Sequence, residues 1–349
     1  MNDVIGILGY GGKMGTALCS IIPKHVPLKL GQRNLTDGKR ANAVYQQVDI
    51  CDTVSMEEFT NDISVLINCA GPSMKLLDFA ANAAAKRGIP YIDAFGGDVL
   101  ERRLKDSRVK GSFVLNAGSF PGLTGSLPLE MADTYFESVE SFSLEVDNHE
   151  NWGKASALDL VFSAMDHYGR AGKYYCNGQI VSCDNNNFSK SEYINNETIN
   201  IAKILDASEA HFIQVREDEE EAKELQQIIQ QYIVTRDDNL LESKFKNKMS
   251  KQISEEYFKI SCVMDGRENN YKKEVLEELV FANSYLAGSA VLYHCAKRLL
   301  SMEKRLSLGV KNAYEVAKGS LLLDECVALG AKRTIEITEE EEMEEGSIL

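Results

Sequence analysis

The 349-residue chain is long enough for two packed domains, and its 44% of hydrophobic residues can fill a sizeable core. A formal net charge of −15, which no run of Lys or Arg offsets, excludes nucleic acid and anionic membrane surfaces as expected partners. The eight cysteines form no CxxC pair, and neither a signal peptide nor an apolar run of transmembrane length is recognisable, so we expect a reduced, cytoplasmic protein without a metal site.

From residue 3 to about residue 117, short apolar runs alternate with helical patterns, which is typical of βαβ units in a parallel sheet. Helices are predicted over 13–22, 55–60 and 73–88, the last with Ser73 as its N-cap and Gly88 as its end. Strands are predicted over 4–9, 27–33, 43–49, 64–71, 90–95 and 112–118. Six strands in this order predict an α/β fold with a Rossmann-type doubly wound parallel sheet.

After residue 125 the pattern changes to that of a second, α+β domain with a mostly antiparallel sheet. The Asn177-Gly178 pair between apolar flanks predicts a hairpin over 173–183, and Ser156 is the predicted cap of a helix that ends at Gly169. Residues 209–234 are expected to form one long helix with the acidic run 217–221 on its solvated face. Further predictions are a strand over 141–148, strands over 256–266 and 271–281, the second of which also fits helical spacing, a helix over 283–300, and a disordered or solvated acidic tail over 336–349.

A glycine-rich loop lies between the first predicted strand and the first predicted helix. Glycines at positions 9, 12 and 15 fit GxxGxxG, whereas those at 9 and 11 begin the stricter GxGxxG, whose third glycine position holds Met14. Bare backbone at a helix start lets a pyrophosphate approach unpaired amides, and the position inside a βαβ unit favours this interpretation over a plain turn. The predicted contacts are Gly9, Gly11, Gly12, Lys13, Met14 and Gly15.

The end of the second strand distinguishes the two nicotinamide cofactors, because an acidic residue there binds the ribose 2′-hydroxyl and a basic one accommodates a 2′-phosphate. Arg33 stands there without a neighbouring acid and favours NADP over NAD, although a plain surface arginine is the alternative. Asp49 is placed to reach the adenine amino group, or it is an ordinary loop residue. The stretch expected beside the middle of the dinucleotide is Asn68, Cys69, Ala70, Gly71 and Pro72.

Three segments, INCAGP (67–72), YIDAFGG (91–97) and NAGSFPGLTGSLP (116–128), resemble the saccharopine dehydrogenase-like family in order and spacing. The resemblance covers about residues 3–165 and, weakly, the helix that contains Tyr285. It implies NADP- or NAD-dependent reduction of imines, or oxidation of secondary amines, on amino-acid-derived substrates. It also implies a homodimer, and a loop under the nicotinamide in which Gly118 and Phe120 contact the cofactor and Pro121 and Gly122 contact the substrate.

With this resemblance the organisation becomes a dinucleotide-binding domain over 1–125, a substrate and dimerisation domain over 126–282, and a helical return to the first domain over 283–335. Two departures from the family leave the substrate and the direction of reaction open. Gly96-Gly97 replaces the usual Gly-Glu, and Lys154-Ala155-Ser156 stands where many relatives have a Ser-Gly-Thr-like turn.

Imine reduction requires a hydride donor and a proton source for the nitrogen. Asp93, at the carboxyl edge of the sheet, is one candidate, and its alternative role is a structural hydrogen bond. His149 could donate the proton, and Lys154 with Ser156 at a helix start could bind a substrate carboxylate, although a polar surface loop explains these residues equally well. Tyr285 is a further substrate candidate whose alternative role is packing.

The leading hypothesis is therefore an NADP-dependent oxidoreductase that acts on a carbon–nitrogen bond of an amino-acid-derived small molecule. One alternative is a reductase of a cyclic imine or a carbon–carbon double bond in a specialised biosynthetic pathway. A non-catalytic NADP-binding redox sensor is the alternative from a different class of protein.

Overall fold

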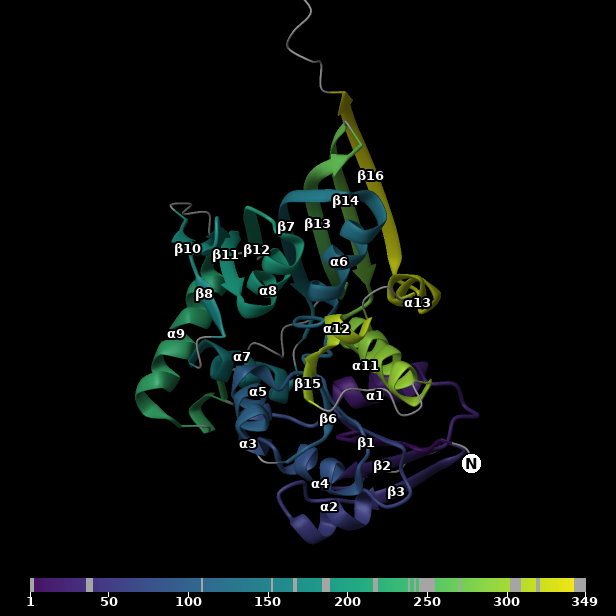
Figure 1. The fold of residues 1–349 in the computed structure, drawn as a ribbon. Helices are drawn as coiled ribbons and strands as arrows, with labels where there is room; N and C mark the ends of the chain where they lie inside the picture. The colour runs from purple at the N-terminus through teal and green to yellow at the C-terminus, as the bar shows by residue number, and fades with distance from the viewer. Residues whose placement is uncertain are drawn as a thin grey trace, which may run out of the picture.

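Two β-sheets form the framework of the molecule, and helix α11 (Ser284–Ser301) contacts strands of both (Figure 1). The computed structural model describes residues 3–35, 40–107, 109–151, 153–165, 168–183, 189–215, 219–237, 239–241, 243–244, 255–269, 271–301, 309–317 and 321–341. Among the helices of these ranges, none is long and apolar enough to cross a lipid bilayer.

The first sheet has seven parallel strands in the order β15-β6-β5-β4-β1-β2-β3, which confirms the predicted Rossmann-type fold. Strand β15 was not predicted, and it lies within the expected helical return over 283–335. The strands are β1 (Ile5–Leu8), β2 (Leu28–Gln32), β3 (Ala43–Gln47), β4 (Val65–Asn68), β5 (Tyr91–Asp93), β6 (Ser112–Leu115) and β15 (Gly309–Asn312).

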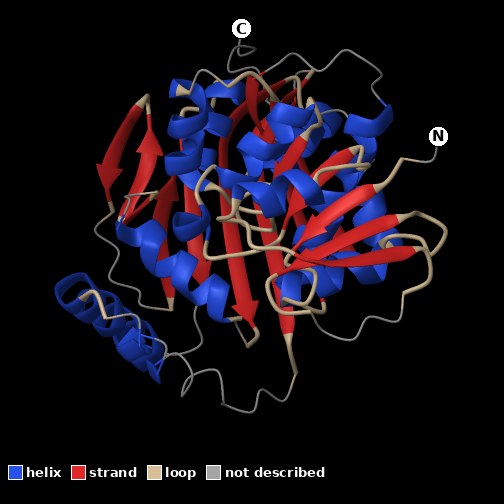
Figure 2. Ribbon diagram, turned by 90° about the horizontal axis from the view of Figure 1, so that it is seen from below, coloured by secondary structure: helices blue, strands red, loops and turns tan. Residues whose placement is uncertain are grey.

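Both faces of this sheet are buried, because alternate side chains of one strand enter different hydrophobic clusters. Ile67 of β4 belongs to one cluster and Leu66 to the other. Helices cover the two faces (Figure 2). They include α1 (Lys13–Ile21), α2 (Thr53–Phe59), α4 (Phe79–Arg87) and α5 (Gly97–Asp106).

The predicted helix over 73–88 is wrong in one respect, because the structure divides it into α3 (Ser73–Leu76) and α4. Leu77 separates the two with a left-handed φ of 47°. Ser73 is the first residue of α3 and not its N-cap, which is Pro72. The predicted end is confirmed, since Gly88 adopts the left-handed conformation with φ 69°.

The second sheet has nine strands and is mostly antiparallel, as predicted, with one parallel pair formed by β7 and β12. Its main path runs β10-β9-β12-β7-β13-β14-β16, and β11 and β8 join beside β12. The hairpin over 173–183 is confirmed, with Asn177 and Gly178 both at positive φ. The strands are β7 (Ser138–His149), β8 (Gly169–Ala171), β9 (Lys173–Cys176), β10 (Gln179–Ser182), β11 (Lys190–Asn195), β12 (Glu209–Val215), β13 (Tyr257–Glu268), β14 (Tyr271–Phe281) and β16 (Lys332–Glu341).

Two stretches of this second half differ from the prediction. The expected helix over 209–234 begins as strand β12, in which Ala210 and Phe212 are buried and Glu209–Val215 pairs with β7, and only α9 (Glu219–Thr235) is helical. Residues 217 and 218 of the predicted acidic run lie outside the described residues. The acidic tail expected over 336–349 is solvated over residues 336–340, which are exposed, but it is not disordered there, because residues 332–341 form β16 and pair with β14. Residues 342–349 lie outside the described ranges.

The remaining helices connect the two sheets or cover the second one. The predicted cap at Ser156 is wrong, because α7 already begins at Lys154 and Ser156 lies in its first turn. Asn195 caps α8 by accepting a hydrogen bond from the Thr198 amide at 2.9 Å. These helices are α6 (Leu123–Tyr135), α7 (Lys154–Met165), α8 (Asn196–Leu205), α12 (Ala313–Ala317) and α13 (Leu322–Ala328).

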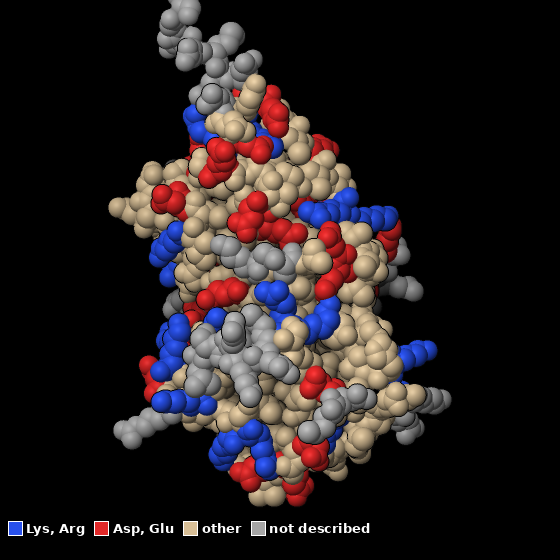
Figure 3. All heavy atoms as spheres, turned by 45° about the vertical axis from the view of Figure 1, so that its right-hand side comes forward, with Lys and Arg blue, Asp and Glu red and all other residues tan. Residues whose placement is uncertain are grey.

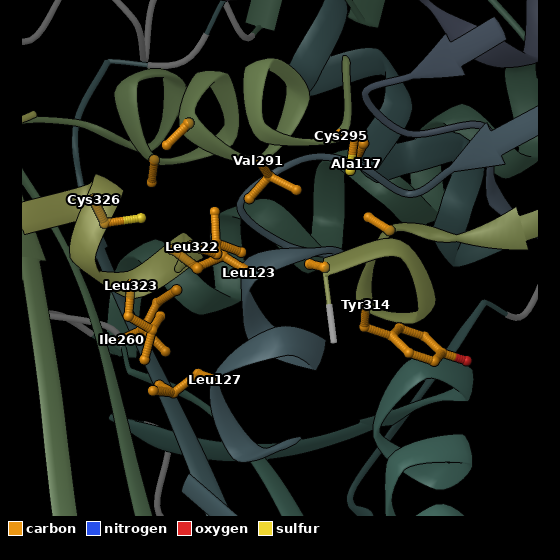
Figure 4. Close-up of a cluster of buried hydrophobic side chains, with 14 of the residues drawn as sticks. Ala117, Leu123, Leu127, Ile260, Val291, Cys295, Tyr314, Leu322, Leu323 and Cys326 are labelled. Carbon is orange, nitrogen blue, oxygen red and sulfur yellow. The ribbon is translucent and has the colours of Figure 1, made fainter. Parts of the chain in front are cut away.

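One hydrophobic cluster joins the two sheets. Figure 4 shows part of it, where Leu123 of α6, Ile260 of β13 and Val291 of α11 lie together with Leu322 of α13. Strands of the Rossmann sheet, such as β1 with Ile7, belong to the same cluster. The two halves therefore share a core, and the boundary near residue 125 stays a prediction.

Candidate active site

The glycine-rich loop turns sharply between β1 and α1 at the carboxyl edge of the first sheet. Gly9 has a left-handed φ of 75°, and a Cβ on Gly15 would overlap the Gly9 carbonyl oxygen and lie 2.5 Å from the Cα of Tyr10. The loop therefore requires glycine at both positions. Gly12 is the N-cap of α1 and provides no side-chain cap, so the first turn of the helix presents its amides without a side-chain acceptor.

The end of β2 is tied to this loop by a residue that the sequence analysis did not select. The side-chain oxygen of Gln32 accepts a hydrogen bond from the Gly11 amide at 2.8 Å, and its amide nitrogen donates to the Asn34 carbonyl. Arg33 follows directly and is exposed, and its side chain has no hydrogen bond or ion pair with the described part of the chain. The predicted contact of Arg33 with a 2′-phosphate therefore stays a prediction.

Asp49 follows β3 and is exposed. Its carboxylate accepts a hydrogen bond from the Cys51 amide at 3.0 Å, and its own amide donates to Ser55 at 3.1 Å. These local bonds are those of an ordinary turn, so the predicted adenine contact stays a prediction.

Asn68 and Asp93 form a buried network at the ends of β4 and β5. The Asn68 side chain donates to Asp93 at 3.0 Å and accepts from the Ala70 amide at 3.1 Å. Asp93 also accepts from the Tyr91 hydroxyl and from the Phe95 amide at 3.0 Å, and it is only 2% exposed. Burial raises the pKa of the Asp93 carboxyl against the opposing effect of these hydrogen bonds. All of these contacts are internal, and they give Asp93 a structural role.

The segment that follows β4 at this edge contains Cys69, Gly71 and Pro72 and runs toward the second half of the chain. Burial raises the pKa of the Cys69 thiol well above its usual range, so it remains a neutral thiol at neutral pH. A Cβ on Gly71 would lie 2.9 Å from Ala155 and 3.1 Å from an Asp159 oxygen, both on α7. Helix α7 therefore lies directly across the predicted cofactor segment.

The loop over 116–122 contacts the segment that follows β5 on one side and helix α8 on the other. Gly118 lies so close to the Ala94 carbonyl that a Cβ would come within 2.7 Å of its oxygen, and the Gly122 amide donates to Glu197 of α8 at 2.8 Å. Phe120 stacks on Phe212 of β12, with ring centroids 4.5 Å apart. The predicted cofactor contact of Phe120 stays a prediction, whereas its observed contact is packing against the second sheet.

Tyr285, at the start of α11, joins several of the predicted residues. Its hydroxyl accepts from the Gly153 amide at 2.7 Å and lies 3.4 Å from the Ser156 hydroxyl. The Lys13 ammonium lies 5.4 Å from the centroid of the Tyr285 ring and donates to the Asn151 carbonyl. Tyr285 thus brings the glycine-rich loop, which holds predicted cofactor contacts, next to the start of α7, which holds predicted substrate contacts.

His149 and Lys154 are the remaining catalytic candidates. His149 ends β7, and its ring stacks on Tyr257 of β13 with centroids 5.4 Å apart. Lys154 is the first residue of α7, and its side chain lies outside what the structure describes. The described residues contain no group of three or more His, Cys, Asp or Glu side chains that could hold a metal ion.

Asp159 is a second residue at this edge, after Gln32, that the sequence analysis missed. One of its oxygens accepts a hydrogen bond from the Ser73 amide at 2.7 Å, while the other lies beside Gly71. Burial, opposed by that hydrogen bond, raises the pKa of the Asp159 carboxyl to about 7. Its signal in the sequence is that it is the one acidic residue of α7 and stands between Leu158 and Leu160.

The sequence matches no protein-family model and no curated protein. The fold is similar to that of apo saccharopine dehydrogenase (L-Glu forming) from Saccharomyces cerevisiae, with a TM-score of 0.66, 10% sequence identity, and coverage of 96% of this chain and 100% of that one. It is also similar to DAP dehydrogenase of C. glutamicum in complex with DAP, with a TM-score of 0.51, 12% identity, and coverage of 94% and 98%. The three short segments that resemble the saccharopine dehydrogenase-like family are thus accompanied by a likeness of fold to one saccharopine dehydrogenase over 96% of this chain.

Proposed function

We propose that this protein is an NADP-dependent oxidoreductase that acts on a carbon–nitrogen bond of an amino-acid-derived metabolite. One observation carries the proposal. The glycine loop and the uncapped start of α1 lie at the carboxyl edge of a parallel sheet, where α7 from the second half of the chain crosses beside them. In doubly wound folds this edge is where ligands bind.

The residues present fit a dinucleotide. Gly9 and Gly15 leave the turn without side chains, the first amides of α1 lack a side-chain acceptor, and Arg33 is exposed at the end of β2. When bound, NADPH would supply a hydride to the substrate. The chain itself would then have to bind the substrate and deliver a proton to the nitrogen.

Asp159 is the proton donor in this proposal. It lies beside Gly71, and with a pKa of about 7 its carboxyl is protonated in a large part of the molecules at neutral pH, which suits a general acid. When the imine carbon accepts a hydride, the electron pair of the C=N bond moves to nitrogen, and nitrogen takes the Asp159 proton. The carboxylate regains a proton from water. In the first turn of α7, Lys154 and the exposed Ser156 are proposed to bind a substrate carboxylate.

The cofactor assignment is tested by titrating the protein with NADPH and NADH and following the cofactor fluorescence. Arg33→Ala should weaken NADPH binding at least about tenfold and leave NADH binding nearly unchanged, because it removes the cation expected to face the 2′-phosphate. Lys24→Ala is the matched control, since it removes an exposed cation in the loop that precedes β2. Absence of NADPH binding by the unmodified protein would contradict the proposed function as a whole.

The proton donor is tested with a panel of 2-oxo acids and amino acids, which form imines in solution. Asp159→Asn keeps an oxygen acceptor for the Ser73 amide but removes the transferable proton. We expect unchanged NADPH affinity, a reductive rate at least about 100-fold lower, and loss of the decline in rate that the unmodified enzyme should show above about pH 7. A variant with an unchanged pH profile would remove Asp159 from the mechanism without touching the cofactor assignment.

A further inference from the structure

Lys13 is the first residue of α1, and its side chain lies against the second half of the chain. Its ammonium donates a hydrogen bond to the Asn151 carbonyl and lies 5.4 Å from the centroid of the Tyr285 ring. Its aliphatic stem passes Gly153, where a Cβ would lie 3.8 Å from the Lys13 Cδ. The residue that the glycine fingerprint predicts as a diphosphate contact therefore contacts the segment that leads into α7.

The first turn of α1 is also packed against α11, and the two helices lie side by side (Figure 1). Met14, the second residue of α1, lies so close to α11 that a Cβ on Gly288 would come within 2.8 Å of its methyl carbon. The Ser289 hydroxyl lies 3.5 Å from the Met14 carbonyl oxygen. The start of α1 is thus fixed at the point from which the Lys13 side chain reaches the second half of the chain.

The segment over 150–153, between β7 and α7, is attached to the same helix α11. Glu150 is 8% exposed, and its carboxyl accepts hydrogen bonds from the amide and the hydroxyl of Ser284, the first residue of α11. A carboxylate at this place is favoured by the unpaired amides of the helix start. At the other end of the segment, the Gly153 amide donates to the Tyr285 hydroxyl at 2.7 Å. Helix α11 therefore holds both ends of the segment.

The Lys13 ammonium adds charge to this arrangement between the two ends. Burial raises the pKa of the Glu150 carboxyl, and its hydrogen bonds and the Lys13 ammonium act in the opposite direction. Loss of the ammonium would therefore remove both a hydrogen bond to Asn151 and a favourable charge near Glu150.

Helix α7, which follows this segment, carries the groups that the proposed function assigns to the substrate. Lys154 and Ser156 lie in its first turn, and Asp159 lies about one turn further along. Because the helix is continuous over these residues, the place of its first turn determines the place of all three.

We propose that Lys13 is a positioning residue for the substrate and not a ligand of the diphosphate. A dinucleotide bound by the first amides of α1 restrains the start of this helix, and Lys13 passes the restraint to the start of α7. Cofactor binding and substrate binding then stabilise each other. This inference rests on the proposed function for the identity of the two ligands, and it adds the residue that connects their sites.

The alternative is that the ammonium binds the diphosphate directly, for which it would have to leave the Asn151 carbonyl. The two assignments differ in what the Lys13→Met variant loses. This variant keeps an unbranched side chain that can pass Gly153, and it lacks the ammonium. A diphosphate ligand would be lost as a fall in NADPH affinity, whereas a positioning residue would be lost as a less ordered α7.

Hydrogen–deuterium exchange of the full chain, with and without NADPH, measures this difference and needs no known substrate. In the unmodified protein, NADPH should slow exchange of the amides over 153–165 at least about threefold. In Lys13→Met these amides should exchange at least about tenfold faster without NADPH, NADPH should no longer slow them, and the NADPH dissociation constant should stay within about fivefold. Lys13→Arg keeps a cationic donor and should restore most of the protection.

Lys24→Met is the matched control, because it removes an exposed cation in the loop that precedes β2 and should leave the exchange over 153–165 unchanged. Figure 3 shows acidic and basic side chains interspersed on the side of the molecule where α1 and α11 lie, so the loss of one cation there changes the overall field little. With any substrate that the panel of 2-oxo acids and amino acids identifies, Lys13→Met should raise KM at least about tenfold and by a larger factor than it lowers kcat.

The proposal is overturned if the NADPH dissociation constant of Lys13→Met rises by more than about fivefold, which would make Lys13 a diphosphate ligand. It is also overturned if exchange over 153–165 is the same in this variant and in the unmodified protein, or if NADPH binds the unmodified protein without slowing that exchange. Failure of the unmodified protein to bind NADPH would contradict the proposed function instead. The exchange of Lys13→Met without NADPH would still test the contact with Asn151 in that case.

Discussion

Replacing Glu197 by glutamine tests how the second half of the chain supports the loop over 116–122. Glu197 lies on α8 and is 6% exposed. Its carboxyl accepts hydrogen bonds from the Gly122 amide at 2.8 Å and from the Thr124 hydroxyl at 2.5 Å. Burial raises its pKa from 4.5 to about 7, although both hydrogen bonds act in the opposite direction.

The raised pKa makes the stability of the protein depend on pH. The folded state binds this proton more tightly than the unfolded state, so the stabilisation is complete below about pH 4.5 and is lost as the pH rises through about 7. The difference between a pKa of 4.5 and one of about 7 corresponds to about 3 kcal/mol of unfolding free energy. Most of this change should fall between about pH 5 and pH 8.

Urea unfolding at several pH values measures the effect. The glutamine side chain in the Glu197→Gln variant can accept the Gly122 hydrogen bond with its amide oxygen and donate an amide hydrogen to Thr124, so this variant should fold. Between about pH 5 and pH 8 the unmodified protein should lose about 2–3 kcal/mol more stability than the variant does. Glu58→Gln, which removes an exposed carboxyl, controls for the loss of one negative charge.

Two half-buried carboxyls, those of Asp159 and Glu130, also have a pKa raised to about 7. Both remain in Glu197→Gln, so their contributions cancel when the two curves are subtracted, provided the sites are independent. If the curves of the unmodified protein and of Glu197→Gln run parallel, Glu197 does not hold its proton in the folded state, and the reasoning about this contact is refuted.

Two further variants test the positions that shape the candidate site. Gly15→Ala should lower the unfolding free energy by about 1–3 kcal/mol, because its Cβ would overlap the Gly9 carbonyl. The matched Gly12→Ala, whose Cβ meets only that oxygen at 3.4 Å, should unfold like the unmodified protein. Equal urea midpoints of the two variants would contradict this difference. Tyr285→Phe should cost about 1–3 kcal/mol in the same assay, because it leaves the Gly153 amide without its acceptor at 2.7 Å, and an unchanged midpoint would show that water replaces the hydroxyl.

The first sheet could be predicted because its signals are local. Each strand is a short apolar run, and the glycines that start α1 and the glycine that ends α4 determine local backbone geometry whatever surrounds them. The glycine loop was therefore placed correctly between β1 and α1. The pairing of β15 with β6 joins segments almost 200 residues apart, and nothing in either segment indicates it.

The errors arose where tertiary contacts decide between two local patterns. Residues 209–215 alternate only weakly, and the acidic run that follows favours a helix, but parallel pairing with β7 and burial of Phe212 make this segment a strand. The acidic end of the chain has the composition of a disordered or solvated tail. Pairing with β14, including an ion pair between Lys273 and Glu339 at 3.3 Å, makes it part of the sheet instead.

Only part of the candidate site could be predicted from the sequence, and the part that was missed depends on tertiary packing. Asp159 becomes notable only because α7 packs against Gly71 and the start of α3, 86 residues away, which buries its carboxyl and raises its pKa. Asp93 illustrates the reverse case, since its position at a strand end is compatible with catalysis or with a structural hydrogen bond, and its three hydrogen-bond donors are those of the structural role. The position of a strand end predicts where a ligand can bind. Which carboxyl can act as a general acid depends on how many hydrogen-bond donors the folded structure places around each one.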